Sequence, residues 1–311
     1  MVYFRQSFSF VSNLANMPVI DPKTIPVPEL HQLLVGSIGP RPIALASTVD
    51  AGGRPNLAPF SFFNIFSSNP PICIFSANLR VVNNTTKDTL RNVQQTGEVV
   101  INAVNFSIIR QVALASVEYP AEVSEFHETG LTPIASDLVK PFRVKESPVQ
   151  FECKVKEILP LGENGGAGNL IVCEILRIHV DEKILDEQGK INPHKIDLMG
   201  RLGRSFYVRA SGEAVHLIHQ PTNKIGIGYH KLPESARQSE VLTGNNLGQL
   251  AAITAPPGPD DVEELRQDAY IAEALQKKPV VNTLHRIAQR ELAKENIELA
   301  ARIVWLADTI K

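Results

Sequence analysis

The chain has 311 residues, of which 43% are hydrophobic and 21% are charged, and its formal net charge at pH 7 is −2. This length is long for one domain and short for two full ones, and the apolar content is sufficient for a buried core without disulfide bonds. The small net charge argues against nucleic acid or an anionic membrane as the main partner, and no apolar run reaches the roughly 18 residues of a membrane span.

Composition changes along the chain and indicates its organisation. Strand-like patterns and nearly all phenylalanines lie before residue 210, whereas the last hundred residues are rich in Leu, Ala, Glu and Gln. We therefore expect an N-terminal arm over 1–20, a β-rich domain over 21–210, and a linker with a helical extension over 211–311. The arm has one Arg and an interrupted apolar stretch, which is a poor match to a signal peptide.

The three cysteines, Cys73, Cys153 and Cys173, lie in apolar, strand-like runs without CxxC spacing. An odd number of cysteines in such surroundings favours reduced, buried thiols in a cytoplasmic protein over a redox or metal-binding role. His216 and His219 are three residues apart, but the sequence places no third ligand near them. We therefore expect no metal site.

In chain order, the first elements predict a β-hairpin followed by two buried strands. A small-residue strand over 42–49 ends at a turn, Asp50-Ala51-Gly52-Gly53, and residues 54–60 return antiparallel. The apolar runs 72–76 and 98–104 are typical of buried strands.

Two helices are predicted near these strands. One covers Lys87 to Gln95, with Thr85 or Thr86 as its N-cap and Gly97 as its stop, and Thr85-x-x-Asp88 fits a capping box. The second is an amphipathic helix over 106–116.

The later strands predict an antiparallel sheet or barrel, because their connections are short rather than helical. Residues 149–156 alternate apolar and polar, residues 169–178 form a long strand candidate, and the glycine-rich loop 162–168 separates them. This loop opens no helix, which excludes a dinucleotide-binding fingerprint there.

After the prolines of 255–259, acidic residues at the beginning of the next segment predict helices. We expect these helices to form an appendage on the barrel, or alternatively a dimer-bracing arm or lid.

The start of the first predicted helix has the chemistry of a phosphate site. Thr86, Lys87 and Thr89 offer hydroxyls, an ammonium and unpaired backbone amides within one turn, although an ordinary solvated lysine beside a cap fits the same pattern. Ser47 and Thr48 could donate hydrogen bonds to a ligand or simply cap the hairpin end. Extended geometry over Ser61–Asn64 would place the two Phe on opposite faces, which fits either core packing or a flat ring edge.

Taken together, these segments resemble the flavin reductase-like family, whose members bind FMN on a split β-barrel. The resemblance rests on PRPIALAST, the glycine turn, NLAPFSFFN, NPP, Phe75-Ser76, Lys87-Asp88-Thr89 and the later Arg201-Leu202-Gly203, and covers about residues 20–210. It implies a mainly β fold with added helices, a Greek-key split barrel that forms a homodimer. It also implies that the flavin is lined by Ser47, Thr48, Ser61, Phe62, Phe63, Asn64 and Ser76, and that its phosphate is surrounded by Lys87, Asp88 and Thr89.

The resemblance further implies an oxidoreductase in which NADH or NADPH passes hydride through FMN to a flavin or another small acceptor. Because the cofactor carries the chemistry, no side-chain nucleophile is required. Arg41 and Arg204 are candidates for positive charge near the reduced ring, and His127 is a candidate donor at the pocket mouth, although each also fits a surface or structural role. Family members commonly have Gly where this chain has Arg204. A non-enzymatic flavin-binding electron carrier, or a scaffold on a degenerate barrel, are the alternatives.

Overall fold

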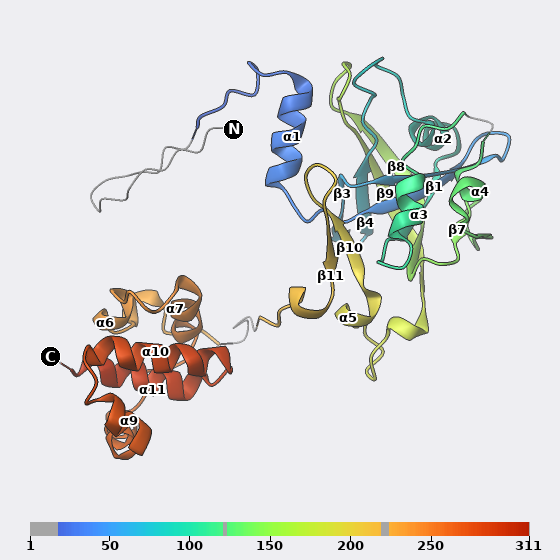
Figure 1. Cartoon of the computed structure of the whole chain (residues 1–311). Helices are drawn as coiled ribbons and strands as arrows, with labels where there is room; N and C mark the ends of the chain where they lie inside the picture. Colours follow the sequence, from blue (N-terminus) through green and yellow to red (C-terminus); the bar gives the residue numbers. More distant parts are fainter. Residues whose placement is uncertain (1–17, 121–122, 219–223, 311) are drawn as a thin grey trace. The chain divides into compact units, whose positions relative to one another are not determined.

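The computed structural model describes residues 18–120, 123–218 and 224–310 and separates the chain into two compact units, Met1–His216 and Leu217–Lys311 (Figure 1). The expected N-terminal arm over 1–20 lies almost entirely outside the described residues. In the part of the chain that is described, none of the helices combines the length and the hydrophobicity needed to cross a bilayer.

The first unit is built on one antiparallel sheet of seven strands, in the order β2-β1-β5-β8-β9-β4-β3. The strands are β1 (Ala44–Val49), β2 (Pro55–Phe60), β3 (Phe63–Ser68), β4 (Pro71–Ser76), β5 (Glu98–Ala103), β8 (Val149–Pro160) and β9 (Asn169–Val180). The hairpin predicted at the start of the domain is confirmed, because β1 and β2 pair antiparallel from Ala44↔Phe60 to Val49↔Pro55.

The sheet is rolled into a barrel. Its two edge strands, β2 and β3, are consecutive in the chain and only Ser61 and Phe62 separate them. The three Cα–Cα steps from Phe60 to Phe63 span at most about 11 Å, so the end of β2 must lie close to the start of β3. A hydrogen bond from the Ser76 N–H to the Phe62 carbonyl (2.8 Å) fixes this corner.

The interior of the barrel is filled by aliphatic, aromatic and cysteine side chains. Phe60 and Phe75 pack there with their ring centres 5.2 Å apart, and the predicted buried, free thiols of the three cysteines are confirmed. The buried members of this core are Ala44, Ala46, Phe60, Cys73, Phe75, Ala77, Leu90, Val93, Val99, Ile101, Cys153, Ile171, Cys173 and Ile175. Since Leu90 and Val93 belong to helix α2 (Asp88–Thr96), the barrel core fixes this helix.

A second core covers the outer face of the sheet. Helices α3 (Ile109–Leu114) and α4 (Glu125–Thr129) contribute Val112 and Phe126 to it, against Leu45 and Leu57 of the hairpin. The helix predicted over 106–116 is therefore present but shorter. Two small antiparallel pairs complete the unit: β6 (Pro133–Ile134) with β7 (Arg143–Val144), and β10 (Leu198–Arg201) with β11 (Tyr207–Ala210).

Two helical details differ from the sequence prediction. Helix α1 (Val27–Ser37) was not predicted, because Val35 is its only buried residue and an exposed helix carries little periodic signal. Helix α2 ends at Gly97 in the left-handed conformation, as predicted, but Lys87 is its N-cap and no side chain caps it. The capping box expected from Thr85 is wrong, because the Thr85 hydroxyl instead donates to Asn83.

The second unit is helical and has its own core. Helices α10 (Val280–Ala293) and α11 (Ile297–Asp308) pair along their lengths and bury Leu284, Leu292, Ile303 and Leu306. The remaining helices are α6 (Glu234–Arg237), α7 (Gly244–Ala251), α8 (Pro259–Glu264) and α9 (Ala269–Ala274). As predicted, acidic residues, Asp260 and Asp261, occupy the first turn of the helix after the prolines.

Candidate flavin site

The start of α2 gathers several polar groups. Lys87 precedes the first helical residue, Asp88, and among the described residues no side chain bonds to the amides of Asp88 and Thr89. The first N–H groups of a helix have no intrahelical partner and attract anions. Helix α2 therefore presents free donors beside Lys87.

Two cations lie at this helix start. The Lys87 Nζ is 5.3 Å from the centre of the Phe60 ring, and burial, together with the charge of Arg80, lowers the pKa of Lys87. Arg80 donates to the Thr85 hydroxyl (3.1 Å) and to the Thr86 carbonyl, and its Nε pairs with Glu118 (2.6 Å). Sequence reasoning missed Arg80; its signal was a cation in the polar segment that joins a buried strand to a helix start.

The predicted ring-side residues gather at the barrel corner. Ser76, at the end of β4, is buried and donates to the Asn78 side chain (2.9 Å). Phe63 packs against the barrel core, whereas Phe62 is 37% exposed and lies 6.1 Å from the His31 ring, so the two Phe point in different directions as predicted. Asn64 is exposed, and its side chain accepts from the next backbone N–H.

Ser47 and Thr48 are both fully buried, but they point to opposite faces of β1. Thr48 accepts hydrogen bonds from Asn56 (3.3 Å) and Asn92 (3.1 Å), and Thr89 also accepts from Asn56 (3.0 Å). The two threonines therefore join α2 to the hairpin through amide side chains. Within the described residues, the Ser47 hydroxyl has no hydrogen-bond partner.

Arg41 is buried and joins the backbone at the end of α1 to the backbone at Leu202. Its guanidinium donates to the carbonyls of Val35 and Ile38 (both 2.6 Å) and of Leu202 (3.1 Å), and it reaches the Ser61 hydroxyl at 3.4 Å. Burial lowers the pKa of Arg41, and the nearby Arg201 adds to this shift. The side chain thus fixes the backbone behind the barrel corner.

The other two predicted candidates are exposed. The His127 side chain is 87% exposed and pairs with Glu128 (3.0 Å). Arg204 is exposed in the β10–β11 turn with a φ of 54°, a left-handed conformation that favours glycine. The structure gives no contact between either residue and the start of α2.

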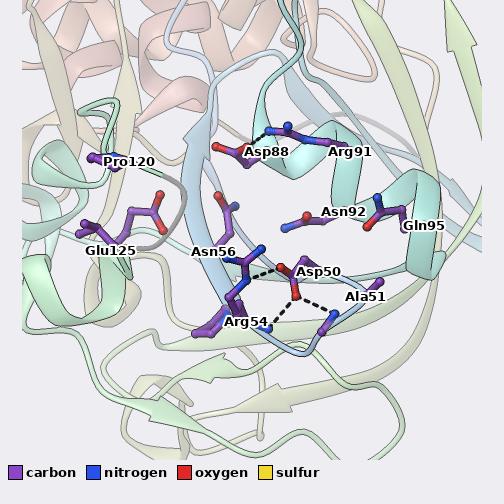
Figure 2. A pocket seen from close by; sticks show the side chains of 13 residues that line it. Asp50, Ala51, Arg54, Asn56, Asp88, Arg91, Asn92, Gln95, Pro120 and Glu125 are labelled. Carbon is purple, nitrogen blue, oxygen red and sulfur yellow. Dashed lines mark hydrogen bonds and ion pairs between the residues drawn. The ribbon is translucent and has the colours of Figure 1, made fainter.

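A polar pocket of about 370 Å³ lies on the Asp88 side of α2 (Figure 2). Its charged residues are largely paired, Arg54 with Asp50 (2.6 Å) and Arg91 with Asp88. Of the predicted cofactor residues, Asp88 alone lines it. The lining residues are Asp50, Ala51, Gly52, Arg54, Pro55, Asn56, Asp88, Arg91, Asn92, Gln95, Pro120, Val123 and Glu125.

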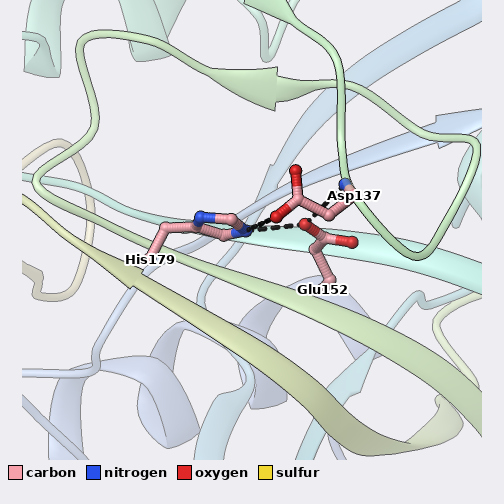
Figure 3. Close-up of side chains that lie close together, drawn as sticks. All are labelled: Asp137, Glu152 and His179. Carbon is pink, nitrogen blue, oxygen red and sulfur yellow. Dashed lines mark hydrogen bonds and ion pairs between the residues drawn. The ribbon is translucent and has the colours of Figure 1, made fainter.

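A second polar cluster joins β8, β9 and the loop before β7 (Figure 3). The buried Glu152 accepts from the N–H groups of Asp137 (2.9 Å) and Leu138 (2.6 Å) and from His179 (2.6 Å). Arg177 pairs with Asp137 at 2.6 Å. Because N–H donors occupy both Glu152 oxygens, hydrogen bonding already satisfies this buried carboxylate.

The rolled antiparallel sheet, with two cations at one helix start, defines the class of split-barrel flavoproteins. The chain belongs to the family of the flavin reductase like domain, whose model matches residues 37–195. An uncharacterised protein of Aquifex aeolicus is 41% identical over 184 residues, which are 59% of this chain and 91% of the relative.

Two solved structures share the fold. Nitrilotriacetate monooxygenase component B from Bacillus cereus superposes with a TM-score of 0.61 at 32% identity, covering 65% of this chain and all of that one. A flavin reductase-like protein with a split barrel domain from Shewanella frigidimarina gives a TM-score of 0.55 at 27% identity, covering 64% and 96%. These findings confirm the predicted split barrel and support flavin binding and a flavin-related oxidoreductase activity on small molecules.

Proposed function

We propose that the chain binds FMN, with the phosphate between Arg80 and Lys87 and the ring system along Ser61–Asn64. The observation that carries the proposal is the meeting of two cations, from separate segments, at an uncapped helix start. Family membership supports a flavin as the ligand, and a phosphorylated flavin suits the two cations at the helix start.

The residues present fit such a phosphate. Lys87 is partly desolvated, and among the described residues no carboxylate bonds to its ammonium, so an anion placed there would regain the solvation that Lys87 has lost. The amides of Asp88 and Thr89, which no described side chain caps, would supply further donors. Thr48 and Thr89, whose hydroxyls already accept hydrogen bonds, would hold the helix in place rather than bind the ligand directly.

When bound, FMN would supply the redox chemistry of the proposed reaction, which is hydride transfer from NADH or NADPH towards a flavin or another small acceptor. The chain itself binds and orients. Arg80 and Lys87 anchor the anionic end, and Arg41 adds a fixed positive charge beside Ser61. We assign no role in the reaction to His127 or Arg204.

We further infer that the chain forms a homodimer in the cytoplasm. Large apolar side chains are exposed on β3, where Phe66 is 64% exposed, and on α1, where Leu34 is 54% exposed. The contact between His31 of α1 and Phe62, the residue just before β3, brings the helix near the start of this strand, so their exposed side chains would form one apolar surface for a second copy. The free, buried cysteines favour a reducing compartment.

The test is a visible absorption spectrum of the purified, FMN-loaded protein, recorded anaerobically before and after NADH and then NADPH. Bleaching of the flavin band by either nicotinamide supports the reductase. Reduction by dithionite alone would instead identify an electron carrier, and a colourless protein that binds no added FMN would favour the scaffold alternative. Light scattering of the same sample measures whether it is a dimer.

A further inference from the structure

The glycine-rich loop between β8 and β9, residues 161–168, lies against the segment that carries Arg80. The backbones pair at Leu79, whose N–H donates to the Ala167 carbonyl (2.9 Å) and whose carbonyl accepts from the Gly166 N–H (3.0 Å). Two asparagines add side-chain bonds, Asn78 to the Gly166 carbonyl (3.1 Å) and Asn84 to the Glu163 carbonyl (2.9 Å). The loop therefore forms hydrogen bonds with the segment 78–84 on both sides of Arg80.

This contact requires glycine. A Cβ on Gly165 would lie 2.9 Å from the Val81 carbonyl oxygen and 3.0 Å from that of Arg80, both of them backbone atoms. A Cβ on Gly168 would lie 2.8 Å from the Ser76 hydroxyl. Contacts this short to backbone force a displacement, so the two backbones can approach this closely only where the side chain is a hydrogen.

The segment 78–84 that the loop contacts lies just before the start of α2 in the chain. Its Arg80 N–H donates to the Thr85 carbonyl (2.9 Å), and its guanidinium holds Thr85 and the Thr86 carbonyl just before Lys87. A shift of the segment would move the Arg80 cation relative to the helix start.

We propose that the glycine loop positions the phosphate anchor, by fixing the backbone from which Arg80 reaches the start of α2. This inference rests on the proposed function, since it concerns the phosphate of FMN. The loop residues touch no ligand themselves; they act through Arg80. The loop would thus set the preference for a phosphorylated flavin over riboflavin, which has the same ring but no phosphate.

The experiment measures dissociation constants for FMN and riboflavin by quenching of flavin fluorescence in Gly165→Ala. We expect the FMN constant to rise about tenfold and the riboflavin constant to change less than about twofold, because a displaced cation weakens only the charge-assisted phosphate contact. The matched control is Gly162→Ala, in the same loop, whose Cβ would meet only the Ala167 methyl, at 3.3 Å. It should bind FMN like the wild type.

A double-mutant cycle with Arg80→Ala tests whether Gly165 affects FMN binding through Arg80. If the loop acts through Arg80, Gly165→Ala adds little to Arg80→Ala; additive losses would overturn the proposal. The proposal would also be overturned if Gly165→Ala lost affinity equally for FMN and riboflavin, or lost no affinity for either. A wild type that binds FMN and riboflavin equally would refute the phosphate anchor itself, whereas an FMN preference that survives Gly165→Ala refutes only the role of the loop.

If Gly165→Ala does not fold, Asn84→Gly serves instead. It removes the side-chain bond to Glu163 without adding bulk, and glycine tolerates the φ of 55° at this position. The same selective weakening of FMN binding is expected, and an unchanged FMN to riboflavin ratio would contradict the proposal.

Discussion

The carboxylate of Glu125 accepts a hydrogen bond from the Leu57 N–H at 3.1 Å, and in doing so it closes the edge of strand β2. The neighbouring outward positions of this edge, two residues away on either side, are Pro55 and Pro59, which have no N–H. The outward side of β2 therefore offers no free donor between Pro55 and Pro59 for another strand to pair with.

Replacing Glu125 by Ala should lower the free energy of unfolding by about 1–2 kcal/mol, because the Leu57 N–H loses its acceptor. Glu125→Gln keeps an acceptor oxygen and should cost less. Urea denaturation at pH 7 measures both variants, and an equal loss in the two would show that the hydrogen bond is not the source of the stability.

Lys87→Ala and Arg80→Ala should each weaken FMN binding by about 1.5–3 kcal/mol, because each removes a charged partner of the phosphate. Titration of the apoprotein with FMN gives the dissociation constants. Arg91→Ala is the control, since Arg91 lies one turn further along α2 and pairs with Asp88. Unchanged affinity in Lys87→Ala would remove Lys87 from the site.

Arg41→Ala should lower the free energy of unfolding by about 2–4 kcal/mol, because the carbonyls of Val35, Ile38 and Leu202 lose a common charged donor. Arg41→Lys keeps the charge but cannot reproduce the planar fork, so we expect an intermediate loss. Thermal unfolding compares them with Arg54→Ala, an exposed ion pair whose removal should cost less than about 1 kcal/mol.

The stability of the first unit should fall in acid partly through Glu152. Burial opposes ionisation of this carboxyl, but the N–H groups of Asp137 and Leu138, together with His179, outweigh it and lower the pKa of Glu152. A carboxyl whose pKa is lowered in the folded state stabilises the fold at any pH above its unfolded-state pKa of about 4.3. This contribution is lost as the pH falls through the lowered pKa of the folded state. Denaturant unfolding between pH 3 and 6 should show a shallower acid loss in Glu152→Gln than in the wild type.

The sequence pattern was sufficient to predict those elements that depend only on neighbouring residues. The hairpin at Asp50–Gly53, the helix stop at Gly97 and the buried cysteines follow from turn residues, positive φ and apolar runs, and each is confirmed. Closure of the barrel through Ser61 and Phe62 could not be derived in this way, because it depends on which strands form the two edges.

The candidate site could be predicted only in part, because some of its contacts join residues that are far apart in the sequence. Lys87 could be proposed from the helix start alone, whereas Arg80 reaches that point through a segment whose path is set by the distant glycine loop. The structural role of Arg41 could not be derived from the sequence, because nothing local shows that its partners are the carbonyls of Val35, Ile38 and Leu202.

The helical second unit closes its own core without residues from the barrel, and the matched family segment ends at residue 195. A module with a self-contained core can be gained, lost or exchanged by gene fusion without exposing the interior of its neighbour. The redox domain and the helical module are therefore free to evolve at different rates within one polypeptide.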